Sequence, residues 1–203
     1  MNIDAIMRLS PVIPVLVIDE DGPDPVELAE TLVANGLRVI EVTLRTPGAL
    51  AAMTAMAGVS GAVVGAGTIL DPDQLLRAID AGAKFIVSPG LTERIGRAAI
   101  DSGVAYLPGV ANSGDIMRGM EMGLDRFKFF PAMASGGLPA LKALCGPFYD
   151  ARFCPTGGIT RGTAPEWLAD PAVLCVGGSW VVPKGEWSMA KIGVLAKTAA
   201  QLR

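Results

Sequence analysis

Lys128 is the lysine whose neighbours in the sequence most strongly indicate a chemical role. It lies within Arg126–Pro131, flanked by phenylalanines, in more apolar company than any other lysine of the chain. An apolar environment disfavours the ammonium form, so a larger fraction of the amine is neutral and able to attack a ketone. The alternative is a structural lysine whose stem packs along apolar surface while its amine reaches water. Lys84 starts another apolar run, and we expect its amine to be exposed at the opposite, non-catalytic end of the fold.

Glu41 is the carboxylate best suited to acid–base chemistry beside such a lysine. In Val39–Arg45 polar and apolar residues alternate, so a strand would place Glu41, Thr43 and Arg45 on one face. A buried carboxylate is costly without a partner. The pattern therefore predicts either a general acid–base or a Glu41–Arg45 ion pair that only fills the interior.

The sequence contains no histidine, and this excludes several mechanisms. Ser-His-Asp and Cys-His nucleophiles, and zinc sites with histidine ligands, all need an imidazole. The cysteines Cys145, Cys154 and Cys175 show no CxxC or zinc-type spacing, and an odd number argues against a disulfide framework. We interpret them as buried, reduced thiols.

Two glycine-rich segments are candidates for phosphate binding. Pro155–Gly158 and Val176–Ser179 each include the end of an apolar run. Glycine lets backbone N–H groups approach a phosphate closely, although ordinary tight turns use glycine as well. The position of these segments is more informative, because the loops after strands seven and eight of a (β/α)8 barrel frequently bind phosphate.

Gly65–Thr68 is similar to the start of a dinucleotide-binding motif, but the motif is incomplete. Leu70 stands where its third glycine would be, and no acidic ribose partner is evident, so we discard that interpretation. Thr68 is interpreted instead as an N–H and hydroxyl donor near a substrate. The alternative is a turn residue that precedes the helix cap Asp71.

Short apolar runs alternate with helical stretches along the whole chain. Asp24-Pro25 and Asp71-Pro72 each give a helix an N-cap and a proline in its first turn, and glycine recurs where helices end and strands begin. This repeat predicts an α/β fold, a single (β/α)8 TIM barrel, with its active site at the carboxyl ends of the strands. The expected strands are Val12–Ile18, Arg38–Thr43, Ala62–Gly65, Phe85–Ser88, Ala105–Pro108, Arg126–Phe130, Arg152–Pro155 and Val173–Val176.

Composition and charge agree with one globular domain over residues 1–203. The chain is 51% hydrophobic and 18% charged, with a formal net charge of -3. It has no cluster of cations for nucleic acid or an anionic membrane. The uncharged stretch Thr46–Leu70 is long enough to span a bilayer, but its small residues and internal glycines favour a helix followed by a buried strand. The start of the chain shows no signal-peptide pattern, so we expect a cytoplasmic protein.

Six sequence blocks contain the residues described above and follow one another in a characteristic order. The order is informative because each block alone is short. The blocks are Glu41–Arg45, Gly65–Thr68, Ser88–Gly90, Lys128–Ala132, Phe153–Gly158 and Gly177–Trp180.

These blocks closely resemble those of the 2-keto-3-deoxy-6-phosphogluconate aldolase and 4-hydroxy-2-oxoglutarate aldolase family, from Pro11 to about Pro183. The resemblance implies a class I aldolase in which Lys128 forms a Schiff base and Glu41 is the general acid–base. It further implies that Arg45 and Thr68 hold the pyruvyl carboxylate. In the same way, Gly157, Gly158, Gly178 and Ser179 would bind the phosphate, with Thr156 close to the substrate hydroxyls.

The reaction implied by the resemblance is cleavage of 2-keto-3-deoxy-6-phosphogluconate to pyruvate and glyceraldehyde 3-phosphate. No metal or organic cofactor is expected, because an iminium serves as the electron sink. The resemblance also implies a homotrimer. Two alternatives keep the chemistry and change the substrate, to a C4-epimeric 6-phosphogalactonate or to 4-hydroxy-2-oxoglutarate. A third alternative is a non-catalytic barrel that binds a phosphosugar.

One segment departs from the family pattern. Within Pro108–Asp115, the family usually has a threonine after the small residue and a glutamate in place of Asp115. We expect this difference to affect a loop beside the pocket and the fine substrate preference, and not the chemistry at Lys128.

Overall fold

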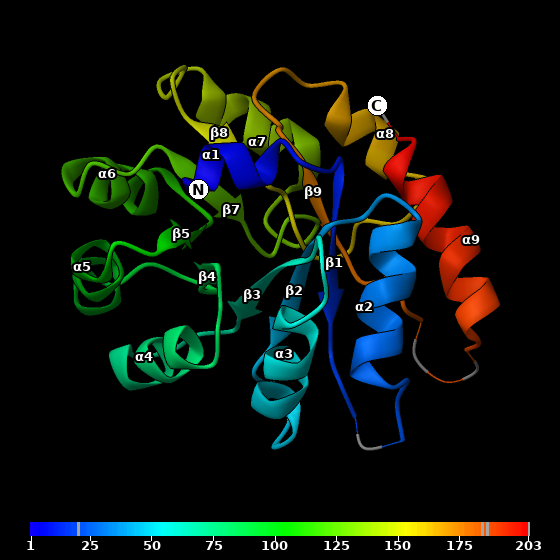
Figure 1. Ribbon diagram of the computed structural model, residues 1–203. Helices are drawn as coiled ribbons and strands as arrows, with labels where there is room; N and C mark the ends of the chain where they lie inside the picture. Colours follow the sequence, from blue (N-terminus) through cyan, green and yellow to red (C-terminus); the bar gives the residue numbers. More distant parts are fainter. Residues whose placement is uncertain (20, 184, 186, 203) are drawn as a thin grey trace.

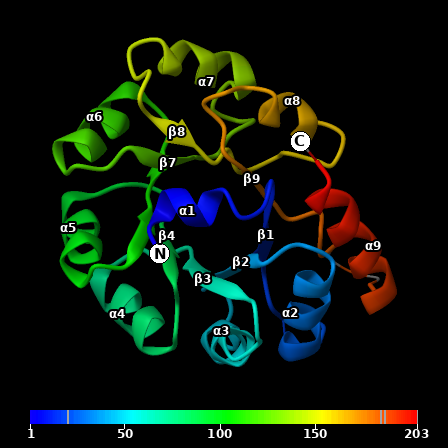
Figure 2. The ribbon, with the colours of Figure 1, turned by 45° about the horizontal axis from the view of Figure 1, so that its top comes forward.

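The computed structural model describes residues 1–19, 21–183, 185 and 187–202. Strands and helices alternate along most of the chain, and the helices other than α1 (Ile3–Met7) lie around the outside of the strands (Figures 1 and 2). The strands are β1 Val12–Leu16, β2 Val39–Thr43, β3 Val63–Gly67, β4 Phe85–Val87, β5 Ala105–Leu107, β6 Gly109–Val110, β7 Arg126–Phe129, β8 Arg152–Phe153 and β9 Val176–Gly178. The helices are α1 Ile3–Met7, α2 Pro25–Ala34, α3 Ala49–Ala57, α4 Pro72–Asp80, α5 Glu93–Ser102, α6 Ser113–Glu121, α7 Gly137–Cys145, α8 Ala164–Leu168 and α9 Met189–Ala200.

All of the described strand pairs are parallel, and they form two sheets. A curled six-stranded sheet has the order β5-β4-β3-β2-β1-β9, and a three-stranded sheet has the order β6-β7-β8. Pro108 alone separates β5 from β6. At the other junction, isolated bridges join Phe153 to Val173 and Thr156 to Gly177. The α/β class and the alternation predicted from the sequence are therefore confirmed.

The helix boundaries follow the predicted caps. The side chain of Asp24 accepts hydrogen bonds from Val26 N and Glu27 N, and that of Asp71 accepts one from Gln74 N. These carboxylates satisfy N–H groups that have no partner within the helix. The glycines predicted at the helix exits all have positive φ, a conformation that glycine adopts without strain. They are Gly36, Gly82, Gly103 and Gly123.

The last strand, β9, differs from the eighth strand of the prediction. It begins at Val176 and runs through Gly177 and Gly178, where the sequence indicated a strand over 173–176 followed by a loop. Because a β-ladder needs only backbone groups, these glycines pair with β1 in the registers Val12↔Val176, Ile13↔Gly177 and Pro14↔Gly178. Gly178 is thus a buried strand residue and not part of a loop.

Helix α1, which the sequence analysis did not predict, lies across one end of the strands (Figure 2). Its Ile6 and Met7 are fully buried and pack against an interior cluster that includes Phe85. Asp4 of this helix forms an ion pair of 2.6 Å with Arg126 at the start of β7. Hydrogen bonds from Arg8 and Arg126 hold the pKa of Asp4 below its usual value. The end of the fold away from the carboxyl ends of the strands is therefore closed.

The charge-free stretch Thr46–Leu70 forms α3 and β3, as the sequence analysis favoured. In the part of the chain that the structure describes, no helix is long and apolar enough to cross a membrane.

Candidate active site

Lys128 and Glu41 meet inside the fold although they come from different sheets. Lys128 Nζ lies 3.1 Å from Glu41 Oε1, and only 6% and 4% of the two side chains are exposed. Lys128 is on β7 and Glu41 on β2, 87 residues apart in the chain. The partner of Glu41 is thus Lys128, and not Arg45 as in the purely structural alternative.

The geometry of the pair is compatible with an amine nucleophile and its base. A single hydrogen bond joins a carboxylate that can accept a proton to an ammonium that must lose one before it attacks a ketone. The ring of Phe130 lies beside the amine, with 5.3 Å between Nζ and the ring centroid. By contrast, Lys84 is exposed at the start of β4, as expected. The two lysines therefore differ in the way that the sequence indicated.

Two glycines of β3 create the space that the pair and its neighbours occupy. A Cβ atom at Gly67 would overlap the carboxylate of Glu41, and one at Gly65 would overlap the ring of Phe85. The alternating glycines of the Gly65-Ala66-Gly67 motif thus accommodate interior side chains. The sequence analysis used this motif only to identify Thr68 and missed the role of the glycines. Their spacing of two residues along a strand places both on one face, and this could have indicated the role.

Arg45 and Thr68 lie together at the carboxyl ends of β2 and β3. Arg45 Nε donates a hydrogen bond of 3.1 Å to Thr68 Oγ1, and Arg45 is exposed. Thr68 has φ of 60°, which is strained for a β-branched residue and is found most often at functional sites. The structure therefore brings together a guanidinium and a hydroxyl beyond the strand ends, a combination suited to a carboxylate.

The two glycine-rich segments are joined to each other. Thr156 is buried, forms a bridge with Gly177, and its Oγ1 donates to Cys154 O at 3.3 Å. Gly157 and Gly158 follow with φ of 104° and 77°. A positive φ at both positions strongly favours glycine.

Gly178 and Ser179 have different surroundings. Ser179 is exposed, whereas a Cβ at Gly178 would overlap the ring of Trp180. Of the two, Ser179 is therefore the exposed residue, and Gly178 is buried.

The buried thiol of Cys175 lies near Glu41, and the sequence analysis assigned it no place in the site. Cys154 and Cys175 belong to the same interior cluster. A contact with Cys154, burial, and the nearby charge of Glu41 together raise the pKa of the Cys175 thiol. Cys175 is thus held as a neutral thiol near the carboxylate. Nothing in the spacing of the cysteines in the sequence signalled this proximity.

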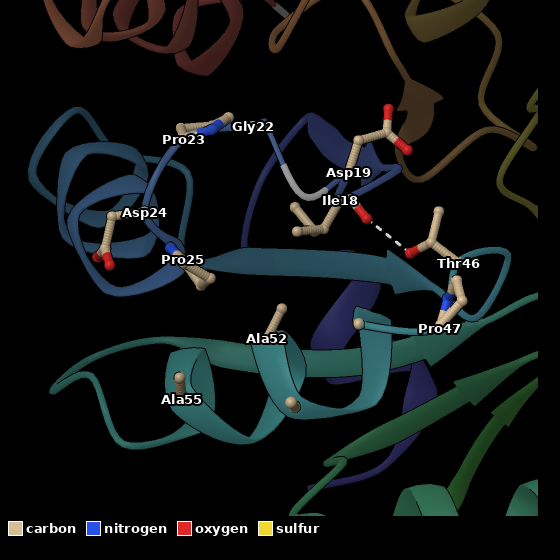
Figure 3. A pocket seen from close by; sticks show the side chains of 12 residues that line it. Ile18, Asp19, Gly22, Pro23, Asp24, Pro25, Thr46, Pro47, Ala52 and Ala55 are labelled. Atoms are coloured by element: carbon tan, nitrogen blue, oxygen red, sulfur yellow. Dashed lines mark hydrogen bonds between the residues drawn. The ribbon is translucent and has the colours of Figure 1, made fainter.

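Two large cavities open beside the segment that follows β1. One, of about 710 Å³, is bounded by Ile18 and Asp19 on one side and by the turn at Thr46 on the other (Figure 3). The second, of about 700 Å³, is lined by Asp19, Ser179 and Trp180, among others. Neither of these two cavities is lined by Lys128 or Glu41, whose side chains are buried in the interior.

The model of the family described as KDPG and KHG aldolase matches residues 3–195 of the chain. Among curated relatives, the 2-dehydro-3-deoxy-phosphogluconate aldolase of Zymomonas mobilis is 57% identical over 202 residues, which is 100% of this chain and 97% of the relative. The KHG/KDPG aldolase of Escherichia coli is 49% identical over 181 residues, or 89% of this chain and 84% of the relative.

Solved structures of aldolases with the same family names are also similar to this chain. The crystal structure of the 2-keto-3-deoxy-6-phosphogluconate aldolase of Zymomonas mobilis with 3-phosphoglycerate has a TM-score of 0.96 at 58% identity, covering 99% of this chain and 96% of that one. The KDPG aldolase of Legionella pneumophila, with pyruvate captured as a covalent carbinolamine intermediate, has a TM-score of 0.93 at 42% identity and covers 99% of each chain.

Proposed function

Because the chain belongs to the KDPG and KHG aldolase family, we propose that it cleaves 2-keto-3-deoxy-6-phosphogluconate to pyruvate and glyceraldehyde 3-phosphate. It would then be an aldehyde-lyase of the Schiff-base class. The observation that carries this proposal is the buried pair of Lys128 and Glu41, with 3.1 Å between the amine and the carboxylate. A non-catalytic phosphosugar-binding barrel would have no need to bury this costly pair.

The proposed cycle begins when the neutral amine of Lys128 attacks the ketone carbon C2. Loss of water gives an iminium, which draws electrons from the C3–C4 bond. Glu41 removes the proton of the C4 hydroxyl, the bond breaks, and the aldehyde leaves. The resulting enamine is protonated at C3 and hydrolysed to pyruvate, which restores the amine. The iminium is the electron sink, so the cycle uses no metal or organic cofactor.

Residues at the carboxyl ends of the strands would hold the parts of the substrate that do not react. Arg45 and Thr68 would bind the pyruvyl carboxylate, which suits their contact of 3.1 Å beyond β2 and β3. The loop after β8, through Gly157 and Gly158, and the end of β9, through Gly178 and Ser179, would bind the phosphate, with Thr156 near the substrate hydroxyls. The Zymomonas relative was solved with 3-phosphoglycerate, a phosphorylated three-carbon compound, and this supports a phosphate site.

We also propose that the two sheets close into one (β/α)8 barrel, a single domain over residues 1–203. The support is the single residue between β5 and β6 and the bridges between the β8 and β9 segments. A cytoplasmic homotrimer completes the proposal. The free thiols suit a reducing compartment, and the solution mass by light scattering tests the trimer.

A paired-substrate assay tests the proposed function and its phosphate site. Binding energy from the phosphate, which does not react, helps to orient the substrate. An unphosphorylated analogue should therefore have a lower kcat/KM, by at least about tenfold for each 1.4 kcal/mol of binding energy that is lost. Release of pyruvate is followed for 2-keto-3-deoxy-6-phosphogluconate, its dephosphorylated form, the C4 epimer and 4-hydroxy-2-oxoglutarate. The last compound is included because the Escherichia coli relative is named a KHG/KDPG aldolase.

Variants of Gly158 and Gly178 provide the internal control for this assay. Gly158→Val and Gly178→Val should reduce the preference for the phosphorylated substrate, because a side chain at Gly158 would strain a backbone with φ of 77° and one at Gly178 would displace the ring of Trp180, and both changes disturb the proposed phosphate site. Equal wild-type efficiency on the phosphorylated and dephosphorylated compounds would refute a phosphate site. Unchanged discrimination in both variants would mean that the phosphate binds elsewhere.

A further inference from the structure

The turn that bears Arg45 is attached on both sides by hydrogen bonds to neighbouring strands. Leu44 N donates to Gly67 O of β3 at 2.9 Å. On the other side, the hydroxyl of Thr46 donates to Ile18 O, beyond the end of β1, at 2.6 Å (Figure 3). The residues immediately before and after Arg45 are therefore each held by a different strand or strand extension.

The Thr46 hydroxyl forms a hydrogen bond to the segment after β1, beyond the point where the backbone pairing between β1 and β2 ends. The last register pair of these strands is Leu16↔Val42. Beyond it, Thr43 Oγ1 donates to Leu16 O at 2.7 Å, and Thr46 Oγ1 donates to Ile18 O. Two side-chain hydroxyls thus continue the connection between the two segments past the end of the sheet.

The segment after β1 passes from the core to open space: Ile18 itself is buried in the core, whereas Asp19 next to it is exposed. Asp19, Gly22 and Pro23 line the cavity of about 710 Å³ and also the cavity of about 700 Å³. The bond from Thr46 therefore reaches the backbone at a buried residue that directly precedes the residues bordering open space. The bond from Thr46 also crosses between the two walls of the first cavity (Figure 3).

We propose that Thr46 is a positioning residue for Arg45 in the binding of the substrate carboxylate. The inference rests on the proposed function, in which Arg45 binds that carboxylate. The Thr46–Ile18 hydrogen bond holds the backbone after Arg45, while the Leu44–Gly67 bond holds the backbone before it. The guanidinium is then kept at Thr68, 3.1 Å from its hydroxyl, before substrate arrives. Preorganisation of this kind lowers the cost of binding.

The test compares Thr46→Val, which removes the hydroxyl and keeps the shape, with Thr46→Ser, which restores it. The readout is the pyruvate concentration that gives half-maximal trapping of the Lys128 adduct by borohydride. Loss of one hydrogen bond of this type should raise that concentration about three- to tenfold, and Thr46→Ser should restore it. The kcat for cleavage at saturating substrate should change much less, because Arg45 contacts a group that does not react.

A matched control comes from Thr54, whose hydroxyl donates to Leu50 O within α3 at 3.0 Å and is exposed. Thr54→Val removes a comparable hydroxyl–carbonyl bond and should leave half-saturation unchanged. In an Arg45→Ala background, Thr46→Val should have no further effect, because the group that it positions is gone. A merely structural Thr46 would instead lower the thermal midpoint alike in both backgrounds without changing half-saturation.

The possible outcomes distinguish the positioning role of Thr46 from the proposed Schiff-base function of Lys128. Unchanged half-saturation in Thr46→Val, with a normal wild-type adduct, would overturn the role of Thr46 alone. An equal shift in the wild-type and Arg45→Ala backgrounds would do the same. Absence of any adduct in the wild type would overturn the Schiff-base function and the role of Thr46 with it.

Discussion

Lys128→Arg should abolish aldol cleavage, with pyruvate release falling to the level of a reaction without enzyme. Arginine keeps a positive charge beside Glu41, so the interior ion pair and the fold can persist. The guanidinium, however, stays protonated and cannot form an iminium with a ketone. The measurement is the rate of pyruvate release from 2-keto-3-deoxy-6-phosphogluconate by the purified variant. Circular dichroism verifies that the variant is folded.

Lys84→Arg is the matched control, since Lys84 is exposed at the start of β4 and should tolerate the same change. Substantial cleavage by folded Lys128→Arg would show that the nucleophile lies elsewhere. Loss of activity in both variants would point to a general effect of arginine on this protein.

Glu41→Gln should lower kcat by about 10²- to 10⁴-fold, the usual contribution of a general acid–base. The amide keeps the shape of the side chain and can still accept a hydrogen bond from Lys128, but it cannot take the proton of the C4 hydroxyl. Steady-state cleavage kinetics at saturating substrate give the answer. If kcat stayed near the wild-type value, Glu41 would have only the role of filling the interior beside Lys128.

Most of the fold was predictable because its elements end at residues with strong local preferences. Asp24 and Asp71 cap the helices as expected, and the exit glycines have positive φ. The prediction was wrong where long-range pairing overrides local preference. Gly177 and Gly178 lie in β9 because β1 supplies hydrogen bonds to their backbones, and a sequence window contains no information about a strand more than 150 residues away.

The candidate site shows the same division between local and long-range information. Lys128 and Glu41 are recognisable because burying a charge is costly and their runs are apolar. Their contact across the interior needed the fold. Cys175 and Thr46 gave no signal in the sequence, since a thiol beside Glu41 and a hydroxyl bound to Ile18 O depend on how distant segments meet.

The most direct test of the account is the position of the bond that pyruvate forms with the protein. Incubation with pyruvate and borohydride, followed by proteolysis and peptide mass mapping, locates the reduced adduct. We expect a three-carbon label on Lys128, with Lys84 as the internal comparison within the same digest. A label on another lysine, or no label under conditions in which the enzyme is active, would contradict a Schiff base at Lys128.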